Sequence, residues 1–280
     1  MKSCPLHGWR SGLRIYCRAA MLRKMARTDL PGEPLELPYP PRIVAETDDF
    51  LVVDKPPFLR IHPSKPDQTD TLWNELRALL AYEIANGGQV SIINRLDRET
   101  SGLVLVAKHR AAAKKYSQLM ERRGIGKEYL ALAFGWPAQD AWSVDAPLLR
   151  QGDIRPSKIY LKQCVHPDGA ASLTRFRVER RFAKDGAKFS LIRAFPETGR
   201  MHQIRIHLAH SGHPVVGDKI YGGDETCYLD FIETGWIPAL AKRLLLARHA
   251  LHSCTLITDE HAWRTGLPPD LAAWSGLAPA

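Results

Sequence analysis

Apolar and polar residues alternate along the chain with two different periods, which predict both strands and helices. Residues 42–57, RIVAETDDFLVVDKPP, hold two short β-rich runs on either side of the polar turn ETDD and therefore predict a β-hairpin. Residues 71–85 predict one helix, because apolar side chains recur at helical spacing and Gly87-Gly88 follows as a stop. The apolar positions of this helix are Leu72, Leu76, Leu79, Leu80 and Ile84.

The segments that follow continue this mixture of periods. Residues 103–107, LVLVA, are apolar on both faces and predict a buried strand. A helix is predicted over 110–123, and further strands are predicted over 127–135, 189–196 and 249–258. Because strands occur both in hairpin-like runs and between helices, we expect a mixed α+β sheet.

The composition changes twice along the chain and predicts three segments. Residues 1–39 read as a basic, flexible N-terminal arm with a Pro-rich linker, 40–265 as one catalytic domain, and 266–280 as a C-terminal tail. The arm is free of acidic residues up to residue 28, and three interpretations of it stay open. It is a disordered tail, an organelle transit peptide, or an extension upstream of a true start at Met21 or Met25.

Bulk composition narrows the class of protein. The 280 residues are 45% hydrophobic and 25% charged, which is ordinary for a globular protein, and no apolar run approaches the ~20 residues of a membrane helix. The five cysteines are odd in number and form no C-x-x-C pair, so we expect reduced thiols. A cytoplasmic protein is expected, with an organelle as the alternative if the arm is a transit peptide. No protein partner is implied, and we expect a monomer.

The net charge of +9 is unevenly distributed. Residues 1–28, which contain no acidic residue, carry +7 of it, whereas residues 29–94 carry −6. Residues 95–130 carry +5 and residues 146–210 carry +8. This polarity suits a phosphate-backbone partner, although an ordinary solvated surface explains it equally well.

Asp97 is the first candidate for chemistry. It lies in the polar loop NRLDRETS, directly before the buried strand, and a rigid strand can hold a loop side chain still. The neighbouring Arg95 and Arg98 favour its ionised form. An Asp before Thr-Ser-Gly is also typical of an Asx turn, and spacing alone does not separate the two interpretations.

Residues 197–223, ETGRMHQIRIHLAHSGHPVVGDKIYGG, contain the second candidate group. Thr198 as N-cap and Gly212 as stop predict a helix, with an alternating strand as the competing interpretation. Its apolar face would hold Met201, Ile204, Leu208 and Ser211. His202 and Arg205 would then be neighbours at the margin of the core, where they can reach a cleft.

Two further observations concern metals and aromatic groups. Four histidines (202, 207, 210 and 213) leave a metal-dependent hydrolase open, because His207 and His210 could share a helix face, although the spacing does not match H-E-x-x-H. In the strand KEYLALAFG, Tyr129 shares a face with Lys127 and Ala131. A cleft-facing Tyr offers a ring that can stack on a base, whereas the simpler interpretation is a half-buried strand residue.

Taken together and in this order, the stretches resemble the RluA-type pseudouridine synthases. The family signature runs H-R-L-D-x-x-T-S-G, K-x-Y-x-A and T-G-R-x-H-Q-I-R-x-H-L-A-x-x-G-H-P-x-x-G-D-x-x-Y-G. Here it reads NRLDRETSG, KEYLA and TGRMHQIRIHLAHSGHPVVGDKIYG, with VVDKPPFLRIHPS and RHALHS as supporting matches. The resemblance covers roughly residues 40–260 and implies an α+β fold: a mixed, largely antiparallel β-sheet core with flanking helices and a central basic cleft.

The resemblance also implies roles for individual residues. Asp97 would be the catalytic carboxylate, Arg205 would pair with it, and Tyr129 would stack on the target uracil and take part in removing its C5 proton. A flipped uridine in structured ribosomal or transfer RNA would be isomerised without cofactor or metal, with Asp97 acting as nucleophile or base. The RNA-binding residues would be Arg95, Arg98, Arg200, His202 and Gln203.

The chain departs from the family pattern at two positions and in its length. Asn94 replaces the usual His, so a mechanism that needs titration there is in doubt, and Met201 replaces the usual Thr. Many relatives carry an S4-type RNA-binding domain, and from the basic and Pro-rich composition of residues 1–45 we expect none here. The alternatives to an active synthase are an inactive RNA-binding protein of the same fold and the metal-dependent hydrolase.

Overall fold

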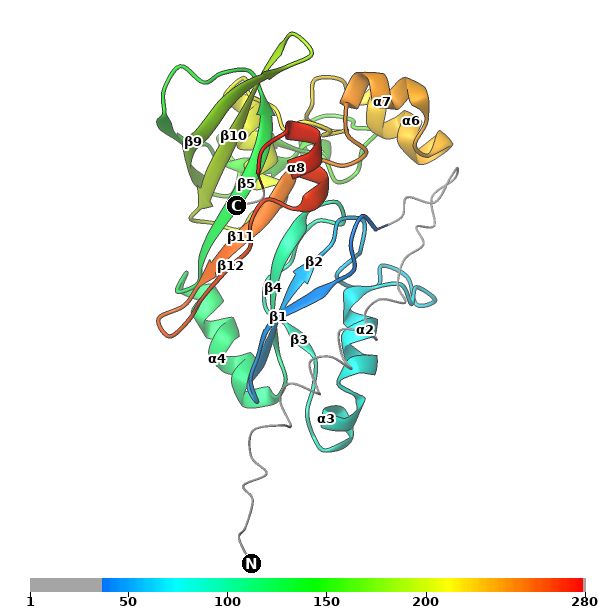
Figure 1. Ribbon diagram of the computed structural model, residues 1–280, viewed down its shortest axis with the longest axis vertical. Coiled ribbons are helices and arrows are strands. Elements are labelled where there is room, and N and C mark those ends of the chain that lie inside the picture. Colours follow the sequence, from blue (N-terminus) through cyan, green and yellow to red (C-terminus); the bar gives the residue numbers. More distant parts are fainter. Residues whose placement is uncertain (1–36, 279–280) are drawn as a thin grey trace, which may run out of the picture.

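The computed structural model describes residues 37–278. A ten-stranded β-sheet forms the centre of the fold (Figure 1). Its main path runs β1-β2-β4-β11-β5-β10-β9-β6, while β12 pairs with β11 and β3 with β4. The neighbours on this path are antiparallel except β4 and β11, which pair in parallel. The strands of this sheet are β1 (Arg42–Glu46), β2 (Phe50–Lys55), β3 (Ser91–Ile92), β4 (Ser101–Ala107), β5 (Gly126–Phe134), β6 (Ala141–Asp145), β9 (Leu173–Lys184), β10 (Ala187–Pro196), β11 (Leu251–Ile257) and β12 (Ala262–Arg264).

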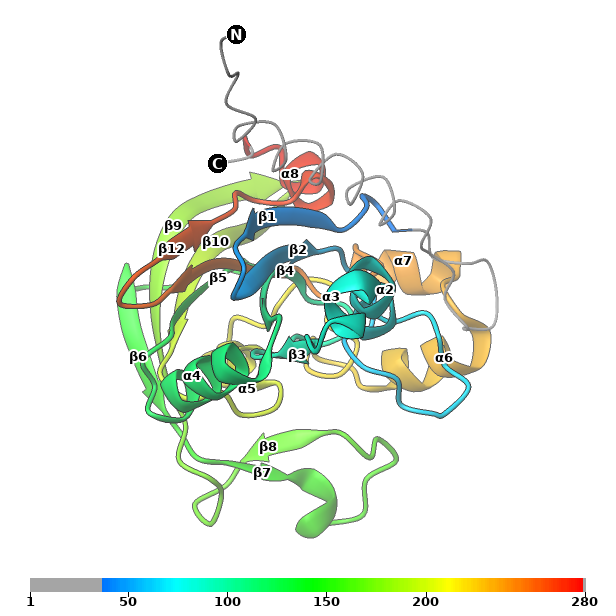
Figure 2. The same cartoon turned by 90° about the horizontal axis from the view of Figure 1, so that it is seen from below.

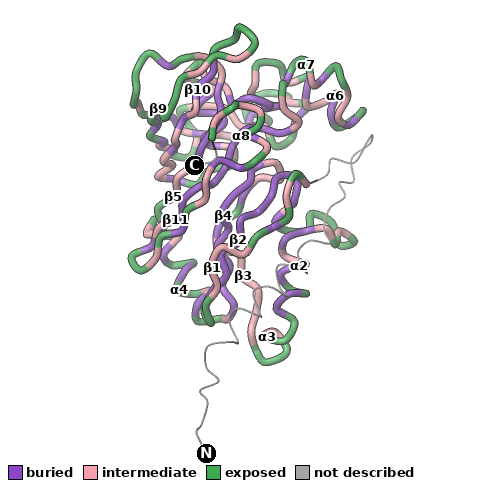
Figure 3. The backbone as a smooth tube through the Cα atoms, in the orientation of Figure 1, coloured by how far each residue is buried: buried purple, intermediate pink, exposed green. Residues whose placement is uncertain are grey.

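Helices cover both faces of the sheet. The helices are α2 (Leu72–Leu79), α3 (Ala81–Ala85), α4 (Arg110–Glu121), α5 (Gln203–His210), α6 (Thr226–Thr234), α7 (Pro238–Leu244) and α8 (Pro269–Ser275). Strand β2 shows how the faces are divided, because alternate residues point to opposite sides. Phe50 packs with Tyr116 of α4 in one core cluster, and Leu51 packs with Leu76 of α2 in the other. Figure 2 shows α4 and α2 beside the sheet, and Figure 3 shows how much of it is buried.

The predicted mixed, largely antiparallel α+β fold is confirmed, and most of the expected elements lie where the periodicity placed them. The hairpin over 42–57 is β1 and β2, and LVLVA lies in β4, where every residue is buried. The helix expected over 71–85 is interrupted: α2 ends at Leu79 and α3 begins at Ala81. Leu79 and Leu80 are both buried and continue the apolar face that Leu72 and Leu76 begin.

The second half of the chain contains elements that the sequence analysis did not predict. In β9, buried Thr174 and Phe176 alternate with exposed Arg175 and Arg177, and the arginines obscure the strand pattern. Strands β7 (Leu148–Arg150) and β8 (Gln163–Val165) form a separate two-stranded sheet, with a 3-10 turn (Gln151–Asp153) after β7. Figure 2 shows this hairpin standing away from the main sheet.

The segment expected to be a C-terminal tail, 266–280, is folded over its described part. Helix α8 begins at Pro269 and buries Leu271 completely in the main core cluster. Asp270 of the same helix accepts two hydrogen bonds from the buried Arg248, at 2.6 and 3.0 Å. The folded body therefore continues beyond the predicted boundary at residue 265. None of the helices between residues 37 and 278 has the length and apolar character needed to cross a bilayer.

Gly102 sits where the loop of Asp97 enters β4, and the local geometry admits only glycine. Its φ of +112° lies in a region that side-chain-bearing residues avoid, and a Cβ there would be 2.2 Å from the carbonyl oxygen of Ser253. This close approach is part of the parallel contact between β4 and β11.

We expect Gly102→Ala to lower the free energy of unfolding by about 3 kcal/mol or more, because backbone strain and a backbone clash act together. Gly186→Ala is the matched control, since Gly186 also has a positive φ (+77°) but nothing within 4 Å of an added Cβ. This control should cost only about 1 kcal/mol. Urea unfolding followed by circular dichroism measures the free energy of unfolding of both variants. If both variants lost the same amount, the close approach of β4 and β11 would not be what requires glycine at position 102.

Candidate active site

A cleft of about 1130 Å³ opens between the Asp97 loop, the start of β5 and the turn before α5. It brings together segments that are far apart in the sequence, namely residues 93–97, 120–129, 195–205 and Leu251. The side chains with a charge or a titratable proton that line it are His62, Arg95, Asp97, Glu121, Arg123, Lys127, Glu128, Tyr129, Arg175, Glu197, Arg200, His202 and Arg205. Asp97, Tyr129 and Arg205, predicted from the sequence as a catalytic group, thus share one cavity.

The loop that carries Asp97 is held by buried polar side chains. Asn94 links it to β4 twice, because its Nδ2 donates to the Leu103 carbonyl (3.0 Å) and its Oδ1 accepts from the Leu105 amide (2.8 Å). Glu99 accepts from Lys219 Nζ at 2.8 Å and from the His249 amide at 3.1 Å. The position where the family signature has His is therefore a structural anchor in this chain, and an amide suits it because it both donates and accepts.

Lys55 also holds the loop that carries Asp97. Its side chain is fully buried, and its Nζ donates to the carbonyl oxygens of Pro56 (2.8 Å), Leu59 (2.9 Å) and Arg98 (3.2 Å). Burial, and then the charge of Arg248, lower the pKa of Lys55 well below its ordinary value. The matching segment VVDKPP thus contributes a structural cross-link to residue 98, one position after Asp97.

Arg205 lies between two carboxylates. Its Nη1 donates to Asp97 Oδ2 at 3.0 Å, while its Nε and Nη2 donate to the two oxygens of Asp218 at 2.6 and 2.8 Å. The Asp218 side chain is 0% exposed and that of Asp97 is 33% exposed. Burial by itself opposes the charge of Arg205, but Asp218 and then Asp97 outweigh it and raise the pKa of the guanidinium.

Asp218 is held in its ionised form. Burial favours the neutral acid, but Arg205 and the backbone amides of Ile220 and Tyr221, which donate to Oδ1 at 3.0 Å each, lower its pKa below the ordinary value. Asp218 lies inside the GDKIYG match, and no role for it was predicted from the sequence. A bidentate pair between α5 and residue 218 cannot be read from spacing, because the partners are 13 residues apart in the chain.

The predicted helix is confirmed against the competing strand, but it begins later than expected and Thr198 does not cap it. Helix α5 begins at Gln203, its N-cap is His202 in the left-handed region (φ 58°), and the Thr198 hydroxyl donates to Gln203 Oε1 at 2.6 Å instead. Met201, expected on the buried face, is 48% exposed at the rim of the cleft. The turn 197–202 takes up the residues that the N-cap pattern assigned to a first helical turn.

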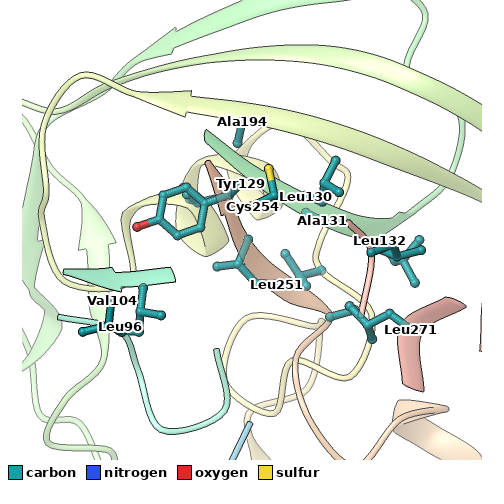
Figure 4. Close-up of a cluster of buried hydrophobic side chains, with 14 of the residues drawn as sticks. Leu96, Val104, Tyr129, Leu130, Ala131, Leu132, Ala194, Leu251, Cys254 and Leu271 are labelled. Atoms are coloured by element: carbon teal, nitrogen blue, oxygen red, sulfur yellow. The ribbon is translucent and has the colours of Figure 1, made fainter. Parts of the chain in front are cut away.

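Tyr129 points from the central strand β5 into the cleft. Its side chain lies beside Leu96 and Leu251, as Figure 4 shows, and only 9% of the residue is exposed. Burial raises the pKa of Tyr129 to about 12. The phenol is therefore protonated at neutral pH.

The residues predicted to bind RNA have different surroundings. Arg95 and Arg200 are exposed and line the cleft. Arg98 is partly buried and lies outside the lining. Gln203 is buried, and its carboxamide is engaged by Thr198, Thr174 and the backbone of Leu173 and Arg200. Lys127, which received no role from the sequence, lines the cleft next to Gly199.

The four histidines considered as metal ligands point in different directions. His207 is buried and contacts Thr174 Oγ1 and the Ala146 carbonyl, while His213 contacts the Phe134 carbonyl. His202 lines the cleft and His210 is exposed. Over residues 37–278, no group of three or more His, Cys, Asp or Glu side chains is arranged to hold a metal ion.

Comparison with known proteins identifies the family of the chain. A family model described as RNA pseudouridylate synthase matches residues 49–210, which is more than half of the chain. The chain belongs to the RNA pseudouridylate synthase family. The match confirms the RluA-type resemblance that the motifs indicated and includes Asp97, Tyr129 and Arg205.

Individual relatives extend the match over most of the chain. It is 33% identical to the ribosomal large subunit pseudouridine synthase D of Pseudomonas aeruginosa, over 95% of this chain and 84% of the relative. It is 38% identical to the protein of that name from Haemophilus ducreyi over 68% of the chain, which spans only 55% of that relative's length. The solved structure of human RNA pseudouridylate synthase domain containing 1 superimposes with a TM-score of 0.64 at 27% identity, covering 89% of this chain and 92% of the human one.

We expect Asp218→Asn to lower the free energy of unfolding by about 3 kcal/mol or more at neutral pH, because it leaves the buried Arg205 without its full counter-charge. Asp97→Asn should cost about 1 kcal/mol or less, since Asp97 is one third exposed. Urea unfolding of both variants measures the difference.

The pH dependence gives a second check on the same pair. The folded-state pKa of Asp218 is lowered, so its stabilisation is present above the ordinary aspartate pKa and is lost as the pH falls through the folded-state value. The difference in the free energy of unfolding between the wild type and Asp218→Asn should therefore become smaller in acid. If Asp97→Asn lowered the free energy of unfolding more than Asp218→Asn, this would contradict the assignment of Asp218 as the structural carboxylate and Asp97 as the one open to the cleft.

Proposed function

We propose that the protein isomerises uridine to pseudouridine in structured ribosomal RNA. The observation that carries the proposal is the partly exposed Asp97, held in a cleft by the buried Arg205 and facing the same cavity as Tyr129. Family membership supports the reaction class, and the large-subunit synthases among the relatives support ribosomal RNA over transfer RNA.

The geometry suits a flipped nucleotide. The cleft is large enough for one nucleoside and lies at the edge of the central sheet, so the target uridine would leave its stack to enter it. Exposed Arg95 and Arg200, together with Lys127 and Arg123, would contact phosphates around the mouth. The acidic side chains in the same lining, apart from Asp97, are Glu121, Glu128 and Glu197.

The reaction breaks the N1–C1′ bond, rotates the uracil and forms a C5–C1′ bond, after which the C5 proton is removed and N1 gains a proton. Asp97 would drive the cleavage as the ionised carboxylate next to the ribose and base. Arg205 keeps its charge throughout, because it is paired on its inner side with Asp218. It therefore orients Asp97 without needing to exchange a proton.

Tyr129 would stack on the uracil with its ring. Because burial raises its pKa to about 12, its hydroxyl is a proton donor at neutral pH. It can receive the C5 proton only if its own proton passes to an acceptor in the same step. Among the carboxylates that line the cleft, Asp97 is the candidate for that acceptor, because its charge acts on the Tyr129 hydroxyl.

Location and assembly follow as parts of the proposal. Cys164, Cys227 and Cys254 are free thiols among the described residues, which suits a reducing cytoplasm. The proposal also keeps the monomer that the sequence led us to expect.

The test compares pseudouridine in total RNA from cells that lack the gene and carry either the wild-type or the Asp97→Asn protein. Carbodiimide-dependent reverse-transcription stops map each modified position. We expect one or a few positions to be restored by wild type and none by Asp97→Asn, although the purified variant still binds the RNA. Modification by Asp97→Asn would remove Asp97 from its role, and RNA binding without any modification by the wild type would favour the inactive RNA-binding protein.

A further inference from the structure

A chain of polar contacts runs from the separate β7–β8 sheet to Asp97. The backbone amide of Gln163, the first residue of β8, donates to Tyr221 Oη at 3.0 Å. Tyr221 Oη lies 2.8 Å from His202 Nδ1, and the other ring nitrogen of His202, Nε2, lies 3.8 Å from Asp97 Oδ2. The four residues come from three distant parts of the sequence, and neither Gln163 nor Tyr221 has a role in the proposed reaction.

The contacts indicate which nitrogen of His202 carries the proton. With the Tyr221 oxygen accepting from the Gln163 amide, its single hydrogen can donate to His202 Nδ1. In this arrangement Nδ1 is the unprotonated nitrogen, and the proton of the neutral ring is on Nε2, the atom that faces Asp97.

The surroundings of His202 keep the ring neutral and in place. Burial, and then the charge of Arg205, lower its pKa to about 4, against the opposing effect of Asp97 and Asp218. The ring packs edge-on to Tyr221, with centroids 5.6 Å apart, and the Tyr221 ring also lies 5.1 Å from the Arg205 guanidinium. His202 has a left-handed backbone (φ 58°), a conformation that persists in non-glycine residues where the surrounding structure imposes it.

His202 and Arg205 are directed at the same oxygen of Asp97. Arg205 Nη1 donates to Oδ2 at 3.0 Å, and His202 Nε2 approaches Oδ2 from 3.8 Å. Within residues 37–278 no hydrogen bond to Asp97 Oδ1 is present, so Oδ1 is the oxygen open to the cleft.

We propose that His202 is a positioning residue, which directs its Nε2–H at Asp97 Oδ2 and, with Arg205, leaves Oδ1 as the reacting oxygen. Tyr221, fixed by the Gln163 amide, sets the tautomer of His202 for this task. The proposal rests on the proposed isomerisation of uridine and changes the role expected of His202 from an RNA contact to an alignment of the carboxylate. It needs no additional proton acceptor, because His202 stays neutral throughout.

The tautomer is tested first, without any activity assay. In protein with ¹⁵N-labelled histidine, the His202 signals are assigned by their absence from His202→Gln. We expect an unprotonated Nδ1 and a protonated Nε2 at neutral pH, and a change in this pattern in Tyr221→Phe. A protonated Nδ1 in the wild type, or a Tyr221→Phe spectrum identical to it, would overturn the proposal.

Kinetics on total RNA from the gene-deleted cells supply the second test. Tyr221→Phe should lower kcat about tenfold, the effect of one lost hydrogen bond, with KM nearly unchanged. His202→Gln should retain more turnover than His202→Leu, because the Gln amide still offers an N–H donor. Tyr116→Phe, in the α4 core away from the cleft, is the matched control and should behave as wild type.

The outcomes separate the two proposals. A rise in KM with unchanged kcat would make His202 an RNA contact, and equal activity of His202→Gln and His202→Leu would leave the N–H donor without a role. Either result overturns the alignment by His202 while leaving the isomerisation intact. If the wild type modifies no RNA, the proposed function fails, and the tautomer measurement alone decides whether the contact chain exists.

Discussion

The guanidinium of Arg205 is the interaction on which the site depends. A buried cation is tolerated only with a counter-charge, and Asp218 supplies one that is itself fully buried and hydrogen-bonded by backbone amides. Because this inner pair is complete, the remaining Nη1 is fixed in direction before any substrate arrives. Asp97 can therefore stay partly open to the cleft, while its Oδ2 is held in one place. Such prior alignment spares the reaction the cost of ordering the carboxylate.

The rest of the fold supports this arrangement from two sides. The Asp97 loop is tied to β4 by Asn94 and to residues 55–59 by the Nζ of Lys55. Arg205 is carried by a short helix whose start is fixed by contacts between the buried carboxamide of Gln203 and β9. Strands β4 and β9 belong to the same sheet, and the β4–β11 approach at Gly102 is part of the path that connects them. Buried polar groups thus hold Asp97 and Arg205 in position, while apolar packing stabilises the sheet on which they are mounted.

The sequence predicted local features well and long-range partners poorly. Periodicity located β4, α4, β5 and β10, because each has a clear apolar pattern. It also predicted the helix α5 but placed its start too early, because the residues before Gln203 form an irregular turn with a left-handed His202 that no spacing rule anticipates. The motifs indicated Asp97, Tyr129 and Arg205. Asp218, Lys55 and the Tyr221–His202 contact emerged only from the structure, because their function depends on burial and on partners from distant segments.

The turnover of Asp218→Asn on its RNA tests the central claim most directly. Asp218 is 0% exposed and cannot touch RNA, so an effect of its substitution on chemistry passes through the groups that it contacts, of which Arg205 is the charged one. The measurement is single-turnover pseudouridine formation at a temperature where the variant is still folded. We predict a loss of roughly 100-fold or more in the rate with little change in RNA affinity, as expected when a charged reacting group loses its alignment. A folded Asp218→Asn protein with the wild-type rate would contradict the account.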